Sequence, residues 1–214
     1  MSDGWLVDAQ RSYDADAPGY TETVRGLLEG NPYLRASLAL FAELVHTAGG
    51  GPVADVGCGP GYVTRHLNDL GVNAFGIDLS PEMIAIACRD YPGLRFEVGT
   101  MTDLDLASDS LTGLLAFWSV IHVPDHAVPG VFAQFRRVLR PGGPLLVGFH
   151  VGEGEARRTA VEPLDGSISI DSYRRRPGQV AGWLREAGFT IEAQLLMRPD
   201  EKVPGAIIVA RGPV

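Results

Sequence analysis

Cysteines and long apolar runs are scarce in this sequence, and both shortages narrow the class of protein. Its 214 residues include two cysteines, Cys58 and Cys88, too few for a disulfide framework or a four-cysteine zinc site. The apolar run around Leu114 to Val123 is much shorter than the ~18 residues that cross a bilayer. The first residues lack the basic stretch and the apolar stretch of a signal peptide. We therefore expect a cytoplasmic protein with reduced thiols and no membrane partner.

Basic residues are also few, which argues against nucleic acid as a partner. Eighteen Lys and Arg stand against 26 Asp and Glu, giving a formal net charge of −8 and a sequence pI near 5.1. Nucleic-acid-binding proteins normally carry a basic footprint, so we expect no nucleic-acid partner. The chain does have an apolar fraction of 45%, enough to bury a core, and the length of one domain. We expect a single domain over residues 1–214.

Helix-like and strand-like patterns alternate along most of the chain. Residues 1–48 predict an N-terminal helical cap segment, in which the polar stretch 1–20 is expected to be a mobile entry and the apolar stripe strengthens after Pro32. Amphipathic helices then separate short apolar strands, and the last helix is followed by two consecutive strands. The expected strands cover residues 53–56, 72–77, 94–98, 113–119, 145–149, 189–197 and 206–210.

This alternation predicts an α/β fold with a doubly wound, seven-stranded sheet that is mostly parallel and has helices on both faces. Because two strands follow each other directly at the end of the chain, we expect one antiparallel edge strand. Residues 151–172 are polar and contain glycine. We expect them to form an irregular loop, or a lid over the site.

A glycine-rich loop, Asp55-Val56-Gly57-Cys58-Gly59-Pro60-Gly61, follows the first expected strand. Glycines at alternate positions let the backbone pass close to a ligand, and open α/β sheets bind ligands at this end of their strands. The spacing differs from the G-x-G-x-x-G of dinucleotide sites, because Tyr62 stands where the third glycine belongs. The carboxylate of Asp55 suits a ligand with a cationic end and would repel a pyrophosphate. A nicotinamide or flavin site is therefore disfavoured.

A second acid, Asp78, stands twenty-one positions after Gly57, at the end of the second expected strand. A carboxylate there can accept hydrogen bonds from both ribose hydroxyls of an adenosine. The alternative is that it caps the next helix, but Ser80 before Pro81 already supplies that cap. The two acids and the glycine loop together resemble class I S-adenosylmethionine-dependent methyltransferases. Around the fourth strand and the tail, the chain is most similar to small actinobacterial members of unassigned substrate.

The resemblance implies a Rossmann-like sheet, S-adenosylmethionine as cofactor and S-adenosylhomocysteine as product. It implies transfer of a methyl group to a small-molecule acceptor, with methylation of oxygen, nitrogen or carbon left open. The family usually has an acid after the third-strand glycine for the adenine amino group; Thr100 stands there, so Asp103 or a backbone carbonyl is expected to replace it. The implied cofactor-binding residues are Tyr20, Asp55, Gly57, Cys58, Gly59, Gly61, Asp78, Leu79, Met83, Gly99, Thr100, Met101 and Trp118.

The catalytic candidate is His122, directly after the fourth expected strand. An imidazole with an ordinary pKa near 6.5 can take a proton from a hydroxyl acceptor, whereas an amine acceptor needs no base. The alternative is that His122 shapes its loop or contacts the cofactor. His150, at the end of the fifth strand, is a candidate substrate contact. Tyr13 is expected either to lie over the cofactor beside Tyr20 or to anchor the first helix.

Three open questions concern charge, metal and catalysis. The run 174–176 of three arginines reads either as a site for an acidic substrate or as a solvated face. We expect no metal, because the clustered acids Asp103, Asp105 and Asp109 fall on the adenine side of the sheet, away from the acceptor. A non-catalytic protein that binds S-adenosylmethionine or S-adenosylhomocysteine is the alternative function, and both a monomer and a homodimer are compatible with the sequence.

Overall fold

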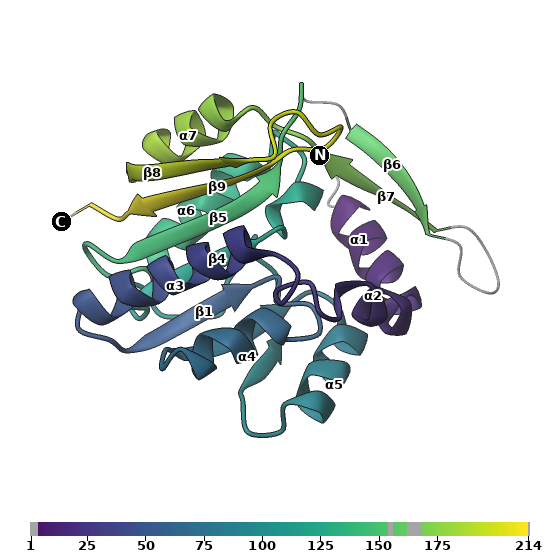
Figure 1. The fold of residues 1–214 in the computed structure, drawn as a ribbon, viewed down its shortest axis with the longest axis horizontal. Helices are drawn as coiled ribbons and strands as arrows, with labels where there is room; N and C mark the ends of the chain where they lie inside the picture. The colour runs from purple at the N-terminus through teal and green to yellow at the C-terminus, as the bar shows by residue number, and fades with distance from the viewer. Residues whose placement is uncertain (1–3, 154–155, 162–167, 214) are drawn as a thin grey trace.

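Seven strands form one sheet in the computed structural model, which describes residues 4–153, 156–161 and 168–213. The strand order is β3-β2-β1-β4-β5-β9-β8, so the order reverses between β1 and β4 (Figure 1). The strands are β1 (Pro52–Val56), β2 (Asn73–Asp78), β3 (Phe96–Val98), β4 (Gly113–Phe117), β5 (Pro144–His150), β8 (Thr190–Met197) and β9 (Gly205–Arg211).

The predicted doubly wound, mostly parallel sheet is confirmed. Strands β1 to β5 pair with their neighbours in parallel. Strand β9 runs antiparallel to both β5 and β8. The antiparallel strand β9 is therefore second from the edge, because it lies between β5 and β8. The edge strand β8 runs in the same direction as β1 to β5.

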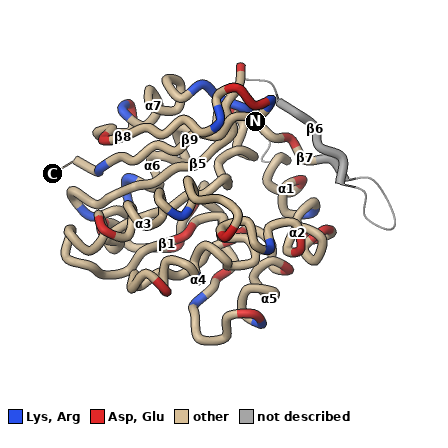
Figure 2. Tube along the Cα trace, viewed as in Figure 1, with Lys and Arg blue, Asp and Glu red and all other residues tan. Residues whose placement is uncertain are grey.

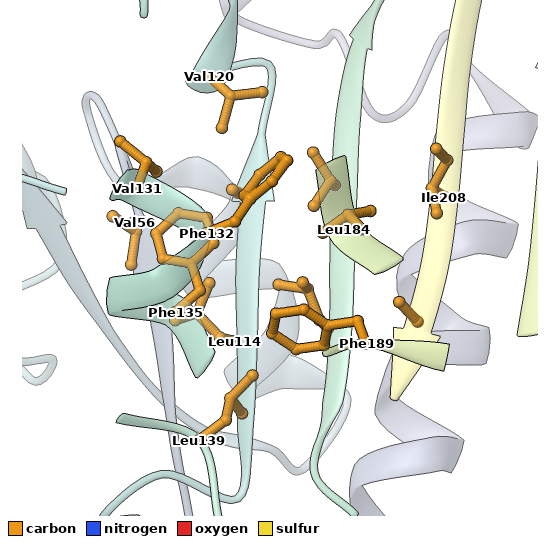
Figure 3. Close-up of a cluster of buried hydrophobic side chains, with 14 of the residues drawn as sticks. Val56, Leu114, Val120, Val131, Phe132, Phe135, Leu139, Leu184, Phe189 and Ile208 are labelled. Carbon is orange, nitrogen blue, oxygen red and sulfur yellow. The ribbon is translucent and has the colours of Figure 1, made fainter. Parts of the chain in front are cut away.

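Helices cover both faces of the sheet. Residues of α3 (Pro32–Thr47) and α4 (Tyr62–Asp69) pack on one face, and those of α6 (Val128–Val138) and α7 (Pro177–Glu186) pack on the other (Figure 3). Helix α5 (Pro81–Asp90) packs against β2 and β3. Strands β4 and β5 lie between the two layers and contain no Lys, Arg, Asp or Glu (Figure 2). This is why their sequences read as continuous apolar runs.

The N-terminal segment is helical from its first described residue. Helices α1 (Gly4–Ala15) and α2 (Ala17–Val24) lie at the edge of the sheet toward which β1 and β5 point (Figure 1). The stretch 1–20, expected to be a mobile entry, is helical over residues 4–15 and 17–20, and its mobility stays a prediction. The buried positions of α1 and the start of α2 are the small residues Ala9, Ser12 and Ala17, so a search for large apolar side chains gives no stripe there.

The stretch 151–172 contains a hairpin. Strands β6 (Ala156–Val161) and β7 (Ile168–Tyr173) pair in antiparallel register, and β7 packs against α1 and the short 3-10 helix η1 (Val120–His122). The described part of the stretch is therefore not irregular, because β6 and β7 are strands. The alternation of isoleucine and polar residues in β7 is too short to stand out in the sequence. The other expectation, a lid over the site, stays a prediction. Residues 154–155 and 162–167 lie outside the described residues. Within the described chain, every helix is too short or too polar to cross a bilayer.

Candidate active site

Two cavities lie where the strand order reverses between β1 and β4, the place where open α/β sheets bind ligands. The smaller has a volume of about 80 Å³ and the larger about 560 Å³. They share one wall, defined here as the residues that line both cavities: Tyr13, Tyr20, Phe117, Trp118 and His122. Two ligands, one in each cavity, would meet across this shared wall.

The glycine loop forms part of the smaller cavity. Gly57 and Gly59 line it, and both have positive φ, 79° and 53°. A Cβ added to Gly57 would lie 2.1 Å from the Cβ of Ser119, far inside van der Waals contact. Gly61 also has a positive φ but faces Phe96 instead, where a Cβ would lie 2.8 Å from the ring. Gly57 therefore lets the loop pack against Ser119 beside the cavity, and Gly61 lets the start of α4 pack against Phe96 and Ala87. An added Cβ at Gly59 would lie 3.6 Å from Tyr20, its nearest neighbour, so this position leaves the cavity open.

Asp78 also lines the smaller cavity. Its Oδ2 accepts a hydrogen bond from the backbone N–H of Gly59 at 2.8 Å, and its Oδ1 accepts one from Ser80 at 2.9 Å. Burial raises the pKa of this carboxyl group, while the two backbone hydrogen bonds lower it. The Oγ of Ser80 caps α5 by accepting from the N–H of Met83, as predicted. Asp78 is thus fixed at the loop with lone pairs left for ligand hydroxyls.

Asp55 is buried beside this loop and is only partly satisfied. Its Oδ2 accepts a hydrogen bond of 2.7 Å from the hydroxyl of Thr64, but its Oδ1 has no partner within the part of the chain that the structure describes. Burial raises the pKa of Asp55 to about 7, against the opposing effect of Thr64. An unpartnered buried carboxylate oxygen calls for a missing partner, and the cationic end of a ligand would supply one. The buried carboxylate of Asp55 thus fits a ligand with a cationic end, as the sequence of the loop predicts.

The turn after β3 completes the smaller cavity. Gly99, Thr100 and Met101 line it, as does Leu79. The hydroxyl of Thr100 is hydrogen-bonded to that of Thr102 at 2.8 Å. Asp103, expected as one possible adenine partner, has an exposed side chain and does not line the described cavity. Backbone groups of the turn remain as the partners for an adenine ring.

Four of the expected cofactor-binding residues are not in the lining of the smaller cavity: Asp55, Cys58, Gly61 and Met83. Cys58 is buried in a cluster with Ile84 and Phe96. Met83 is fully buried in a cluster that packs against Tyr13 and Tyr20. Both support residues that face the cavity. The predicted residues that the structure brings together in the lining are Tyr20, Gly57, Gly59, Asp78, Leu79, Gly99, Thr100, Met101 and Trp118.

His122 and Tyr13 are hydrogen-bonded to each other in the shared wall. The Tyr13 hydroxyl lies 2.6 Å from Nε2 of His122, and Nδ1 of His122 lies 2.9 Å from the backbone carbonyl oxygen of Asp171. A carbonyl can only accept, so Nδ1 carries the proton and Nε2 accepts from Tyr13. Burial lowers the pKa of His122 to about 4 and raises the pKa of Tyr13 well above 10. Both side chains are therefore neutral at pH 7.

Trp118 forms the floor of the larger cavity in an unusual backbone conformation, with a φ of 58°. Its indole ring lies against Gly148 and Gly205, where an added Cβ would lie 2.5 Å and 3.1 Å from the ring. Its Nε1–H donates to Nδ1 of His150 at 3.2 Å. His150 lines the larger cavity, and its contact with a substrate stays a prediction. The sequence analysis did not identify the slot that holds the indole ring; the glycines within β5 and β9 are the signal that could have indicated it.

Among the three arginines at 174–176, Arg175 fits neither expectation: it is neither in a substrate site nor on a solvated face. Arg175 is 1% exposed, forms an ion pair of 2.9 Å with Asp125, and donates hydrogen bonds to the carbonyl oxygens of Val120 and Val123. It therefore holds the segment that contains His122, and neither contacts solvent nor lines the described cavities. Sequence reasoning missed this role. Of the residues of α1 that line the cavities it found only Tyr13, and it missed Trp5, Leu6, Ala9 and Ser12.

Comparisons with known proteins agree with this geometry. A family model described as a methyltransferase domain matches residues 53–143. A probable S-adenosylmethionine-dependent methyltransferase of Mycolicibacterium smegmatis is 27% identical over 198 residues, which cover 88% of this chain and 74% of that protein.

Solved structures show the same fold. The cyclase SpnF superposes with a TM-score of 0.70 at 20% identity, covering 96% of this chain and 95% of that one. The 1,6-didemethyltoxoflavin-N1-methyltransferase of Burkholderia thailandensis, solved with its substrate and S-adenosylhomocysteine, gives a TM-score of 0.63 at 21% identity, covering 91% and 87%.

Fold, loop and relatives define the class: S-adenosylmethionine-dependent methyltransferases. The chain is a class I member of this class, and S-adenosylmethionine is its cofactor, as the resemblance implied.

Proposed function

We propose that this methyltransferase methylates a small molecule that occupies the larger cavity and meets the cofactor at the shared wall. The observation that carries the proposal is the set of five residues common to both cavities. The larger cavity, at about 560 Å³, is within the usual range for small-molecule sites. Aromatic rings supply much of its lining, including those of Tyr33 and Tyr62, which favours a planar or largely apolar acceptor.

The smaller cavity and its surroundings would hold the cofactor. Asp78 would accept hydrogen bonds from the ribose hydroxyls, and the free Oδ1 of Asp55 would pair with the ammonium group. Gly57 and Gly59 would let the loop approach the ligand closely. When bound, S-adenosylmethionine supplies an electrophilic methyl group on a sulfonium centre.

The shared wall would orient the acceptor and keep water out. The faces of Phe117, Trp118 and Tyr20 provide an apolar surface that also suits a nearby cation. His122 is the candidate general base, because its neutral ring keeps a basic nitrogen in the wall at physiological pH. Positioning of the acceptor against the methyl group would account for most of the rate increase.

The non-catalytic alternative has no observation in its favour. It requires the mouth at residues 117–122 to be filled by the protein's own side chains, and a cavity of about 560 Å³ opens there instead. Cytoplasmic location, the absence of a nucleic-acid partner and the choice between monomer and homodimer stay predictions from the sequence.

The test is acceptor-dependent formation of S-adenosylhomocysteine. The protein would be incubated with S-adenosylmethionine and a panel of small phenols, enols and amines, and products would be detected by mass spectrometry. We expect at least one panel compound to gain a methyl group. The Asp78→Asn variant should lose turnover at limiting cofactor, because the binding of S-adenosylmethionine weakens by about 1–3 kcal/mol in calorimetry. Tight cofactor binding without any methylated product would contradict the proposal and favour the non-catalytic reading.

Cofactor affinity should depend on pH through Asp55. Its pKa of about 7 in the free protein means that protons compete with the ammonium group as the pH falls, and Asp78 is the neighbouring charge that adds to this effect. We expect the apparent Kd for S-adenosylmethionine to rise about five- to tenfold between pH 7.5 and pH 6. Calorimetry at each pH would measure it. In Asp55→Asn the dependence should vanish; an unchanged Kd across this range in the wild type would show that Asp55 does not pair with the ligand.

A further inference from the structure

The hydroxyl of Tyr13 and the imidazole of His122 form one hydrogen-bonded unit in the shared wall. They come from α1 and η1, 109 positions apart in the chain, and their polar atoms are 2.6 Å apart. The two rings meet edge to face, with centroids separated by 5.3 Å. Both residues line both cavities, so the pair lies where the acceptor and the cofactor would meet.

The hydrogen bonds of this unit fix which atoms carry its protons. Nδ1–H of His122 donates to the carbonyl oxygen of Asp171 in β7, and the lone pair of Nε2 receives the Tyr13 hydroxyl. The oxygen of Tyr13 keeps a free lone pair through which it can accept a further hydrogen bond. A hydroxyl group in the larger cavity could therefore reach the basic nitrogen of His122 only through Tyr13, or by displacing it.

No other residue of the shared wall offers a basic nitrogen. Tyr20 and Phe117 have none, and the indole nitrogen of Trp118 is only a donor. His150 stands next to the wall, but its Nδ1 already accepts from Trp118. Burial lowers the pKa of His150, so the neutral ring holds its proton on Nε2 and presents a donor.

We propose that Tyr13 and His122 act as a proton relay for acceptors that present a hydroxyl group. Tyr13 accepts the proton of the acceptor while it passes its own proton to Nε2 of His122. This role rests on the proposed methylation of a small molecule, and it names the acceptor class as hydroxyl compounds.

The step balances in atoms and charge. The carbon–oxygen bond forms as the methyl–sulfur bond breaks, the hydroxyl proton ends on Nε2, and the positive charge lost by sulfur appears on the imidazolium. A hydroxyl oxygen becomes strongly acidic as it gains the methyl group, so a base with a pKa near 4 is strong enough for a late proton transfer. The same low pKa keeps Nε2 unprotonated before the reaction at physiological pH.

The first test needs no acceptor. Long-range proton–nitrogen NMR spectra of histidine-labelled protein report the tautomer and the pKa of each of the five histidines, with His122→Gln to assign the signal. We expect His122 to be protonated on Nδ1 only, without titration between pH 5 and 8. The charged or titratable groups that face the pair are His150, Arg175, Tyr20, Tyr62 and Asp78. In Tyr13→Phe, we expect only the Nε2 resonance of His122 to move, to the chemical shift of a nitrogen that accepts no hydrogen bond.

The second test is kinetic. For a hydroxyl acceptor, Tyr13→Phe should lower kcat about 100-fold or more, with the KM of the acceptor and the Kd of S-adenosylmethionine changed by less than about threefold. The double variant with His122→Gln should be no slower than either single variant, because the two groups act in series. Tyr91→Phe removes a phenol hydroxyl outside both cavities and serves as the matched control, with kcat unchanged.

Several results would overturn the relay while methylation itself persists. These are a His122 proton on Nε2, titration of His122 near pH 6.5, an unchanged kcat in Tyr13→Phe, or turnover of amines but of no hydroxyl compound. If S-adenosylmethionine binds but no acceptor of any kind is methylated, the proposed function fails and the relay fails with it. The two failures are therefore distinguishable.

Discussion

Replacement of Arg175 by leucine is expected to lower the free energy of unfolding by about 3 kcal/mol. The leucine leaves the buried carbonyl oxygen of Val123 without the donor that Arg175 supplies, and an unsatisfied buried group costs about 1–3 kcal/mol. The carbonyl oxygen of Val120 loses one hydrogen bond but keeps the one from the backbone N–H of Val123. The ion pair with Asp125 adds little, since the carboxylate side chain is 46% exposed and screened by solvent. Chemical denaturation followed by fluorescence would measure the change.

The neighbouring Arg176→Leu is the matched control. Its side chain is exposed, so we expect a change within about 0.5 kcal/mol. Because η1 loses two anchors in Arg175→Leu, the NMR signal of His122 should also broaden or shift in that variant alone. Equal stability of the two leucine variants would mean that the buried carbonyl groups find other partners, and that Arg175 does not hold this segment.

The second large effect is expected for Gly57→Ala, which should destabilise the fold by about 3 kcal/mol and weaken cofactor binding at least tenfold. An alanine at a φ of 79° costs about 1 kcal/mol or more. Its Cβ, 2.1 Å from that of Ser119, adds an overpacking penalty of about 1–3 kcal/mol. Ser119 is itself fixed by the hydrogen bond of 2.6 Å that its hydroxyl donates to the carbonyl oxygen of Val56, so it cannot move away cheaply.

Gly130→Ala provides the control for this second prediction. Gly130 lies in α6, without a positive φ and with no atom within 4 Å of an added Cβ. Alanine should raise the stability there by about 0.5–1 kcal/mol, because it restricts the unfolded chain and favours the helix. Opposite signs for the two glycine substitutions would confirm that the crowded loop, and not the loss of glycine as such, causes the damage; a tolerated Gly57→Ala would contradict the close approach.

The sheet could be predicted from the sequence because its strands are buried on both faces. The apolar runs over 113–119 and 145–149 locate β4 and β5 to within two residues. The N-terminal helices could not be placed in the same way, since their buried positions are small residues such as Ala9 and Ser12. The hairpin of β6 and β7 was not predicted, because two paired polar strands show little alternation of apolar and polar residues in the sequence.

The site divides along a similar line. The glycine loop and Asp78 were predictable because a strand end followed by a turn places them by local spacing. The Tyr13–His122 contact joins residues 109 positions apart, and the contact of His122 with Asp171 uses a backbone carbonyl that no side chain announces. Arg175 stands between two residues of the same type, so its burial depends on the direction in which the chain leaves β7. Contacts of this kind follow from tertiary structure alone.

The shared wall has a thermodynamic consequence for how the enzyme fills and empties. Five side chains face both cavities. A change in their conformation caused by one ligand therefore changes the affinity for the other ligand. Linkage then requires that the factor by which the cofactor changes the affinity for the acceptor equals the factor by which the acceptor changes the affinity for the cofactor. The two products differ from the two substrates by the position of one methyl group. The coupling factor between the affinities for the two products therefore differs from the factor for the two substrates. The same five side chains that bring the substrates together therefore also set how strongly each product changes the affinity for the other.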